Sequence, residues 1–449
     1  MTVYSLICEF DPLHNGHKLL LDHIRSSGAD CIIACMSGNF TQRGEPAAFD
    51  KRTRARAALR CGADLVLELP VSFACAGAER FALGGVYVLN ALGCVDSIFF
   101  GSECGDISML GKACLAIESG AVSALAGKHL SCGVTFASAR ERAVRELYGN
   151  DAADILRSPN NILAVEYLKA LNRLRSAVTP RTIKRIGACH GDFVPDSKAV
   201  GAYHGDKACT DTERSKAAPL ITASASYLRG LMLSGGDIRP FMPEESYKVF
   251  AEQIPSSCGQ STKNGPHELG RVSPSVTQFP VLLAGRMRAL EGIILYRLRT
   301  MTKEQLAGLP DIGEGLENRL YDAARICTSV PELLGRVKTK RYTMSRIKRL
   351  LMYALLGISR SGLEDYPRYA RILGFNDRGR LALTEIKKRS SLPVITKASE
   401  AARLGGECLR EFELESRCDD IYALSGSVVL PCGTNQSGGI VIEKKRREP

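Results

Sequence analysis

CEFDPLHNGHKLLLDHI, residues 8 to 24, places His14 and His17 around Gly16 where a short apolar run passes into a helical pattern. The amino terminus of a helix carries unpaired N–H groups and a partial positive charge, so it attracts phosphate. Imidazoles three residues apart face the same side of a helix, and each can donate a hydrogen bond to phosphate oxygens. Gly16 permits a close approach of the backbone. The alternative is that both histidines only cap the helix.

Outward from this stretch, residues 1 to about 190 alternate apolar, strand-like runs with helical patterns. This alternation predicts an α/β fold, a Rossmann-like doubly wound parallel sheet with helices on both faces. Ligands of such sheets bind outside the carboxyl ends of the strands. We therefore expect residues 10–17, 37–43 and 101–103, which follow three different strand-like runs, to converge on one rim.

The pattern changes from about residue 236. Residues 281–300, 315–327, 329–340 and 344–358 carry apolar positions at helical spacing with basic residues opposite them. We predict a nucleotide-binding catalytic domain over residues 1–235. A mostly helical basic domain with a small mixed carboxy-terminal segment is predicted over residues 236–449.

Composition narrows the classes of partner. The 60 Lys and Arg against 48 Asp and Glu give a formal charge of +12, which favours a polyanionic partner. The 16 cysteines lie in apolar runs without a CxxC pair, so we expect buried thiols. No run is long and apolar enough to span a membrane, and no signal peptide precedes the first strand. We predict a cytoplasmic protein with no membrane partner and, because no histidine cluster has ligand spacing, no metal site.

Two motifs resemble those of a known superfamily. HNGH, after the first strand, is similar to the HxGH motif of the nucleotidylyltransferase superfamily, and ITASASYLRG at residues 221–230 resembles its ISSTxIR motif. The resemblance implies that Ser224, Ser226 and Arg229, at a helix start, hold the β- and γ-phosphates of ATP. The physical reason is the same helix amino terminus with a guanidinium fork added. The alternative is a Ser-capped surface helix.

An ordered string of further stretches narrows the resemblance to one family. MSGNFTQRGEPAAFDKRTRARAAL, GADLVLELP, FFGSE, SPNNILAVEYLKAL, TIKRIGACH and KTKRYTMSRIKRLLMYALLGI are similar, in that order, to bacterial tRNA(Met) cytidine acetate ligases. The likeness covers residues 1 to about 375. It implies ATP-driven activation of acetate to acetyl-adenylate, with Mg²⁺ accompanying ATP. Acetyl would then pass to the exocyclic amine of the wobble cytidine in elongator tRNA(Met), releasing AMP and pyrophosphate.

The resemblance also implies roles for individual residues. His14 and His17 would be catalytic, acting on the phosphates. Either Asn160 or Asn161 would contact the nucleotide, with Asn160 preferred. The family usually has Asn where Asp11 stands, so Asp11 adds a negative charge that would weaken ATP binding unless it ligates Mg²⁺. The residues expected to bind ATP are Ile7, Cys8, Glu9, Phe10, Asp11, Pro12, Leu13, Asn15, Gly16, Lys18, Leu19, Leu20, Gly101, Asn160, Arg185, Ser224, Ser226 and Arg229.

The loop after the second strand-like run offers small and amide groups near the same rim. There we expect contacts to the acyl group or to the edge of cytosine from Ser37, Gly38, Asn39 and Gln42. Lys51 and Arg54, on the helix that follows, could neutralise phosphate or tRNA charge. An exposed basic helix face explains Lys51 and Arg54 equally well.

A second basic stretch lies in the helical half. KTKRYTMSRIKR has no acidic residue, so we expect it to neutralise RNA phosphates, with one aromatic ring available to stack on a base. A solvated helix face is the alternative. The residues expected to bind RNA are Lys338, Lys340, Arg341, Tyr342, Arg346, Lys348 and Arg349.

Two other functions stay open at this point. HxGH alone would suit an adenylyltransferase that moves AMP onto a small phosphate-bearing acceptor. A non-enzymatic RNA-binding protein could retain an inactive nucleotide fold. Acetate dependence separates the first from a ligase, and the effect of replacing His14 or His17 separates the second.

Overall fold

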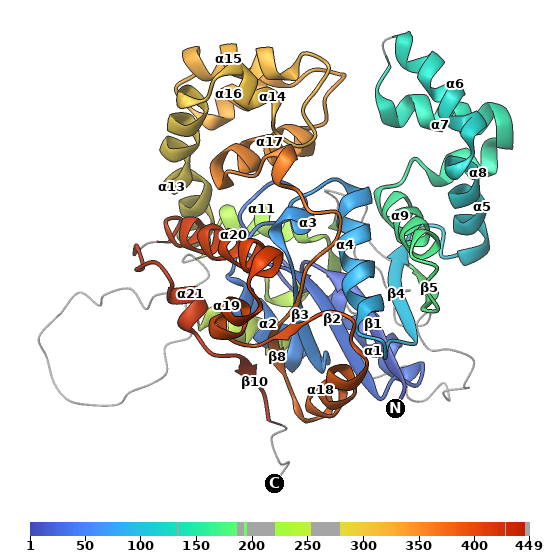
Figure 1. Cartoon of the computed structure of the whole chain (residues 1–449), viewed down its shortest axis with the longest axis vertical. Helices are drawn as coiled ribbons and strands as arrows, with labels where there is room; N and C mark the ends of the chain where they lie inside the picture. Colours follow the sequence, from blue (N-terminus) through green and yellow to red (C-terminus); the bar gives the residue numbers. More distant parts are fainter. Residues whose placement is uncertain (133, 186–192, 195–220, 253–278, 427, 445–449) are drawn as a thin grey trace, which may run out of the picture.

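One large, mostly parallel sheet organises the molecule (Figure 1). The computed structural model describes residues 1–132, 134–185, 193–194, 221–252, 279–426 and 428–444. The sheet has the order β10-β8-β3-β2-β1-β4-β5, with β9 paired to β8. Its strands are β1 (Val3–Cys8), β2 (Cys31–Ser37), β3 (Leu65–Leu69), β4 (Ser97–Ser102), β5 (Thr179–Lys184), β8 (Ala370–Phe375), β9 (Val394–Ile395) and β10 (Val441–Ile442).

The central strands are apolar throughout because helices cover both faces of the sheet. Every residue of β2 is buried, with Ile33 and its alternate neighbours in one core and Ile32 and its alternate neighbours in the other. Strands β3, β2, β1, β4 and β5 pair in parallel. The predicted doubly wound α/β fold is therefore confirmed.

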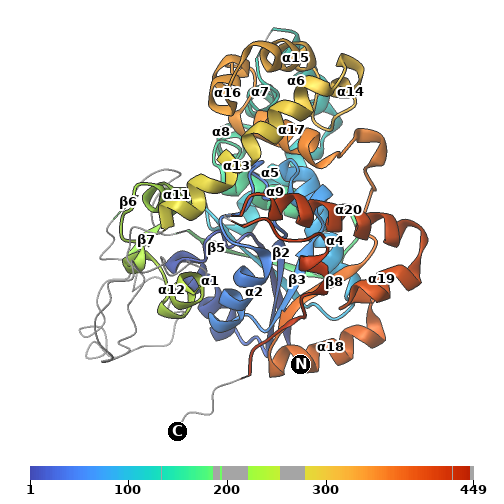
Figure 2. The same ribbon diagram turned by 90° about the vertical axis from the view of Figure 1, so that its left-hand side faces the viewer.

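Two sets of helices cover the sheet (Figure 2). The helices on one face are α4 (Ala78–Ala91), α9 (Pro159–Arg173) and α18 (Asp377–Arg389). On the other face lie α1 (Asn15–Ser26) and α2 (Lys51–Arg60), with α12 (Glu244–Ala251) packed on α2.

The carboxy-terminal part of the chain returns to this sheet. Strand β8 pairs antiparallel with β3, and β10 and β9 pair in parallel with β8. The division of the chain at residue 235 stays a prediction, but the sheet extends across it. The sequence predicts a mostly helical second half and does not indicate strand β8. The apolar run that forms this strand, ARILGF, is short and lies between helical segments.

Two helical regions rise beyond the strand ends (Figure 1). One is inserted between β4 and β5, and consists of α5 (Ile107–Glu118), α6 (Gly120–Ser131), α7 (Phe136–Tyr148) and α8 (Asn150–Ile155). The other consists of α13 (Phe279–Thr300), α14 (Lys303–Ala307), α15 (Leu316–Ile326), α16 (Val330–Val337) and α17 (Met344–Leu356). Remaining elements are α3 (Val71–Ala74), α11 (Ala225–Leu233), α19 (Ala398–Leu404), α20 (Gly406–Ala423), α21 (Thr434–Ser437), the short β6 (Phe193–Val194) and β7 (Thr222–Ala223), and the 3-10 turns η2 (Arg239–Phe241) and η4 (Arg360–Gly362).

In the described part of the chain, no single helix has the length and apolar character that a membrane span requires. Only the bent pair of α5 and α6 passes that test together, by length and composition alone.

Candidate active site

A cleft of about 520 Å³ opens at the carboxyl ends of the central strands. Its walls come from β1 and the loop after it, the loop after β2, the start of α9, the start of α11 and the start of α17. This is where a doubly wound sheet binds its ligand. The predicted ATP-binding residues that line the cleft, together with the two histidines, are Ile7, Cys8, Glu9, Phe10, Asp11, His14, His17, Asn160, Arg185, Ser224, Ser226 and Arg229.

The other residues predicted to bind ATP do not line the cleft. Leu13 is fully buried in the core. The Asn15 amide donates to the carbonyl oxygens of Ile221 and Pro240, at 2.8 and 3.0 Å, and so ties α1 to the segment around α11. Lys18 pairs with Asp22 one helical turn away. Pro12, Gly16, Leu19, Leu20 and Gly101 also lie outside the cleft walls.

The two imidazoles lie together at the amino terminus of α1, as the sequence predicts. The centroids of the two rings are 3.7 Å apart, and the ring planes are stacked at an angle of 23°. His14 is the N-cap residue, and its backbone N–H donates to Nδ1 of His17 at 3.3 Å. Because Nδ1 of His17 accepts, a neutral His17 carries its proton on Nε2. Capping and an active-site position are therefore compatible.

Both imidazoles have pKa values lowered from the usual range of histidine. Burial lowers the pKa of His17 to about 3, and the guanidinium of Arg185 adds to this effect. Burial and the neighbouring His17 lower the pKa of His14 well below its usual range. Nδ1 of His14 is buried without a hydrogen-bond partner in the described part of the chain. The pair can thus donate hydrogen bonds to an anion without carrying a fixed charge.

The second predicted phosphate-binding motif lines the same cleft as the histidines. Ser224 is the N-cap of α11, and its hydroxyl accepts from the Tyr227 backbone N–H at 3.2 Å. Arg229 lies 3.5 Å from the Ser226 hydroxyl and donates to the Asp11 carbonyl oxygen at 2.7 Å. The motif is a Ser-capped helix start, as the alternative held, and it is also part of the cleft.

Asp11 is held by protein groups on both of its carboxylate oxygens. Oδ1 accepts from the Ala48 backbone N–H at 2.8 Å, and Oδ2 lies 3.7 Å from the Arg229 guanidinium. The negative charge that distinguishes this loop from the family pattern is therefore compensated within the protein. This arrangement does not fit a metal ligand whose oxygens are free.

A third group of predicted residues lies at the ends of β4 and β5. Asn160 lines the cleft and accepts from Arg185 at 3.4 Å. Asn161 is buried, and its Oδ1 accepts from the backbone N–H groups of Glu103 and Cys104. A Cβ on Gly101 would approach Cγ of Arg185 to 3.0 Å, so Gly101 leaves room for that side chain. Of the two asparagines, Asn160 is the one that lines the cleft.

The loop after β2 contributes less to the cleft than the sequence suggests. Gln42 lines the cleft, but Ser37 and Asn39 are buried beneath it. The Asn39 amide donates to Asp419 and accepts from the Lys51 backbone N–H, both at 2.8 Å. The Gly38 carbonyl accepts from Arg54. Direct contact of Ser37, Gly38 or Asn39 with substrate is therefore not supported.

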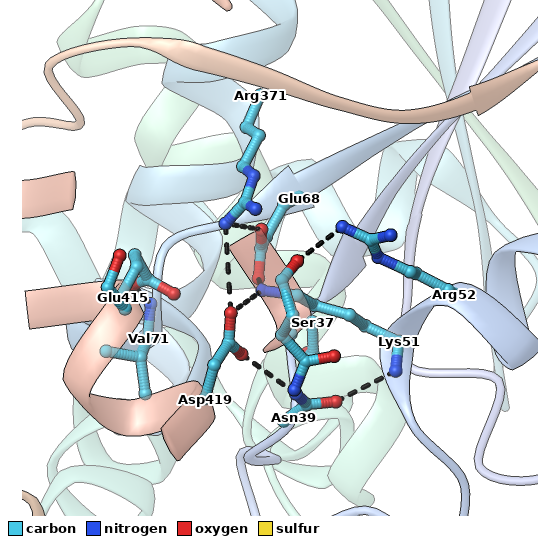
Figure 3. Close-up of polar contacts among 12 residues, drawn as sticks. Ser37, Asn39, Lys51, Arg52, Glu68, Val71, Arg371, Glu415 and Asp419 are labelled. Carbon is cyan, nitrogen blue, oxygen red and sulfur yellow. Dashed lines mark hydrogen bonds and ion pairs between the residues drawn. The ribbon is translucent and has the colours of Figure 1, made fainter. Parts of the chain in front are cut away.

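The structure contradicts both interpretations offered for Lys51 and Arg54, contact with phosphate or tRNA and an exposed basic helix face. Both side chains are fully buried. Lys51 Nζ lies 2.5 Å from Glu68 and 2.7 Å from Asp419, as Figure 3 shows. Arg54 donates to the carbonyl oxygens of Glu9 and Ser37, at 2.7 and 3.1 Å, and so joins the ends of β1 and β2. Neither residue is on an exposed face or available to tRNA.

The cluster around Lys51 joins distant segments of the chain (Figure 3). Glu68 lies on β3, Arg371 on β8 and Asp419 on α20, with Arg371 3.2 Å from Glu68. Burial alone would raise the pKa of Glu68, but Lys51 and Arg371 hold it below its usual value. Burial, with Glu68 nearby, raises the pKa of Asp419.

Helix α17 supplies one wall of the cleft. Thr343, Ser345 and Arg349 line it, and Arg349 also lies 3.2 Å from Asp311. A Cβ on Gly44 would meet the Arg349 backbone N at 2.3 Å, so the β2–α2 loop packs closely against α17. The sequence marks Thr343 and Ser345 as a helix start, but nothing in it places that helix beside the cleft.

The predicted RNA-binding residues divide into free and paired side chains. Lys340 is exposed, with no hydrogen bond or ion pair to the described residues. Arg341 and Arg346 each lie 3.3 Å from Glu314, Lys348 pairs with Glu45, and Lys338 donates to the adjacent Thr339 carbonyl.

Tyr342 contradicts one part of the RNA prediction. Its ring is buried, and its hydroxyl donates to the Glu314 carbonyl oxygen at 2.7 Å. The ring cannot stack on a base while it occupies this position. It packs instead among the apolar side chains of the helical core.

Comparison with known proteins gives consistent matches over nearly the whole chain. The family model described as HIGH Nucleotidyl Transferase matches residues 1–202 and 207–431. A tRNA(Met) cytidine acetate ligase of Acetivibrio thermocellus is 35% identical, over 94% of this chain and 95% of the relative. The ligase of the same name from Thermoanaerobacter sp. (strain X514) is 38% identical, over 95% and 96%.

A solved structure agrees with these sequences. The crystal structure of Thermotoga maritima TmcAL bound with alpha-thio ATP has a TM-score of 0.81 and 28% identity, and the match covers 99% of this chain and 100% of the other. With the cleft, the paired imidazoles and the full-length similarity, this chain belongs to the tRNA(Met) cytidine acetate ligase family of HIGH nucleotidyl transferases.

Proposed function

We propose that this chain is an ATP-dependent ligase that acetylates N4 of the wobble cytidine in elongator tRNA(Met). The acetate carboxylate attacks the α-phosphorus of ATP, pyrophosphate leaves, and acetyl-adenylate forms. The cytidine amine then attacks the acetyl carbonyl and AMP leaves. The cytoplasm, where tRNA is modified and used, is the proposed location.

One observation carries the proposal: two imidazoles at one helix amino terminus line the same cleft as a second helix start, which carries Ser224, Ser226 and Arg229. Donors from two helix starts in one cleft suit a triphosphate whose charge redistributes as pyrophosphate leaves. His17 donates through Nε2, while Arg229 and the hydroxyls receive the leaving pyrophosphate. Asn160 and Arg185 are assigned to the adenosine side.

Mg²⁺ would arrive on the ATP phosphates. Within the described residues no group of His, Cys, Asp and Glu side chains is arranged to hold a metal ion, and both Asp11 oxygens are engaged. Phosphate-borne Mg²⁺ needs few protein carboxylates, because it keeps several waters. Binding of ATP itself therefore depends on the donors described above.

The basic half of the chain supports an RNA partner. Arg349, on α17, lines the cleft, and the exposed Lys340 and Arg341 lie in the segment just before that helix. Holding the tRNA there would leave one splayed anticodon base to enter the cleft. A small-molecule adenylyltransferase would give this basic wall no role.

The test is acetate-dependent exchange of labelled pyrophosphate into ATP, followed by nucleoside analysis of elongator tRNA(Met) incubated with enzyme, ATP and acetate. Both activities are expected. His17→Ala should lower the exchange rate by about 10²- to 10³-fold, as loss of one transition-state donor does. Exchange that ignores acetate would favour the adenylyltransferase. A His17→Ala variant that exchanges and acetylates like the parent protein would contradict the role of the imidazoles.

A further inference from the structure

Glu9, directly after β1 and predicted from the sequence to bind ATP, presents a half-buried carboxylate to the cleft, and the adenylation step proposed above gives that carboxylate no role. Its Oε1 accepts from the Gln42 backbone N–H at 2.7 Å. Its Oε2 has no hydrogen-bond partner in the part of the chain that the structure describes. One oxygen fixes the side chain, and the other is left for a ligand.

The surroundings hold this carboxylate in place. Arg54 donates to the Glu9 carbonyl oxygen at 2.7 Å and to that of Ser37 at 3.1 Å. The loop that carries Gln42 is anchored beneath by Asn39, which bonds Asp419 of the buried cluster in Figure 3. Such support is what a reacting group needs, because small displacements reduce catalysis strongly.

A carboxylate is a poor neighbour for phosphate but a good one for an amine. Among the residues lining the cleft, Glu9 and Asp11 carry the negative charges, and Asp11 is already engaged. Cytosine presents its N4 amino group as a donor, and Asp and Glu are the side chains that accept from it. His14 and His17 have depressed pKa values and are weaker bases than ordinary histidine.

We infer that Glu9 is a catalytic residue of the transfer step, binding the cytidine N4 amine through Oε2 and accepting its proton; this rests on the proposed function. The N4 lone pair forms the new C–N bond to the acetyl carbonyl. The bond from that carbon to the AMP phosphate oxygen breaks, and AMP leaves with the electron pair. One N4 proton passes to Glu9 and then to water, which restores the carboxylate.

The electrostatics around Glu9 favour this role. Burial raises the pKa of Glu9, the Gln42 N–H opposes this, and Asp11 raises it further. Arg43 and Arg229 are the cations that lower it. The thiols of Cys8 and Cys75 and the phenol of Tyr167, also close by, have pKa values raised by burial and stay neutral. A carboxylate with a raised pKa is a stronger base than an exposed glutamate.

The test separates the two half-reactions in Glu9→Gln. Acetate-dependent pyrophosphate exchange should fall far less than acetyl transfer, so the ratio of transfer to exchange, each relative to the parent protein, is the readout. Transfer of acetyl from supplied acetyl-adenylate to tRNA should fall by about 10²-fold or more, the range of general base catalysis. In the parent protein the transfer rate should fall as pH drops through the Glu9 pKa, because the protonated acid cannot accept. In Glu9→Gln this limb should disappear.

Glu79→Gln is the matched control, since Glu79 is an exposed carboxylate that pairs with Lys169. It should leave both half-reactions unchanged. The inference is overturned if Glu9→Gln transfers acetyl like the parent protein, or loses exchange as severely as transfer. If Glu9→Gln loses both activities, Glu9→Asp shows whether misfolding is the reason. A folded Glu9→Asp variant that loses exchange as severely as transfer also overturns the inference. If the parent protein neither exchanges nor acetylates, the proposed function itself fails.

Discussion

Two stretches of this chain are similarly rich in Lys and Arg, KRTRAR at residues 51–56 and KTKRYTMSRIKR at residues 338–349. They differ in how deeply their basic side chains are buried. Lys51 and Arg54 are completely buried, whereas Lys340 and Arg341 are exposed. The cause is the position of the partners: Glu68, Asp419 and backbone carbonyls surround Lys51 and Arg54 in the interior, whereas Arg341 pairs with Glu314 at the surface and Lys340 is exposed to solvent. Density of positive charge alone does not locate a nucleic-acid surface.

The strongest way to break the comparison is to remove one cation from each stretch. Lys51→Met should lower the free energy of unfolding by about 3–5 kcal/mol, because the buried carboxylates of Glu68 and Asp419 would be left with Arg371 as their one shared cation among the described residues. Lys340→Met should change it by less than about 0.5 kcal/mol. Chemical denaturation measures both. Equal stabilities for the two variants would show that the Lys51 cluster is not maintained.

The pH dependence of stability tests a second buried charged group, the carboxyl of Glu411 on α20. Burial raises the pKa of Glu411 to about 7, although its hydrogen bond from the Arg368 backbone N–H acts the other way. The folded state therefore holds this proton more tightly than the unfolded state. The contribution of Glu411 to stability is full below about pH 4.5 and is lost as pH rises to about 7, a change of order 3 kcal/mol.

Glu411→Gln should remove that loss, so its unfolding free energy relative to the parent protein should rise between pH 5 and pH 8. Glu413→Gln, an exposed position on the same helix, is the control and should show no such difference. Parallel pH profiles for all three proteins would mean that Glu411 titrates normally.

The smallest expected effect is on tRNA binding, and it concerns the exposed Lys340 in the stretch of residues 338–349. Lys340→Glu should weaken binding of elongator tRNA(Met) by about tenfold at low salt and reduce the salt dependence of binding, while leaving stability and pyrophosphate exchange unchanged. Lys387→Glu, exposed on α18, makes the same charge change far along the chain. If both variants lower binding equally, the effect comes from net charge and the α17 surface is not the RNA site.

Much of the cleft follows from local chemistry. HNGH after a strand and SASYLR at a helix start place donors where any parallel sheet gathers them, so His14, His17, Ser224 and Arg229 could be predicted. Tyr342 could not, because its burial depends on the Glu314 carbonyl that a distant turn supplies. Thr343 and Ser345 reach the cleft only because the β2–α2 loop packs on α17 at Gly44.

Periodicity and motif order in the sequence alone determined the alternating β/α architecture, the position of the cleft at the strand ends and the family. Tertiary structure decided which charges are internal, that β8 extends the sheet from a distant part of the chain, and that Asp11 is neutralised by Arg229. The physical reason is range. Hydrogen bonding and amphipathicity within an element are set by neighbours in sequence, whereas burial of an ion is set by partners such as Asp419, which lies 368 residues beyond Lys51.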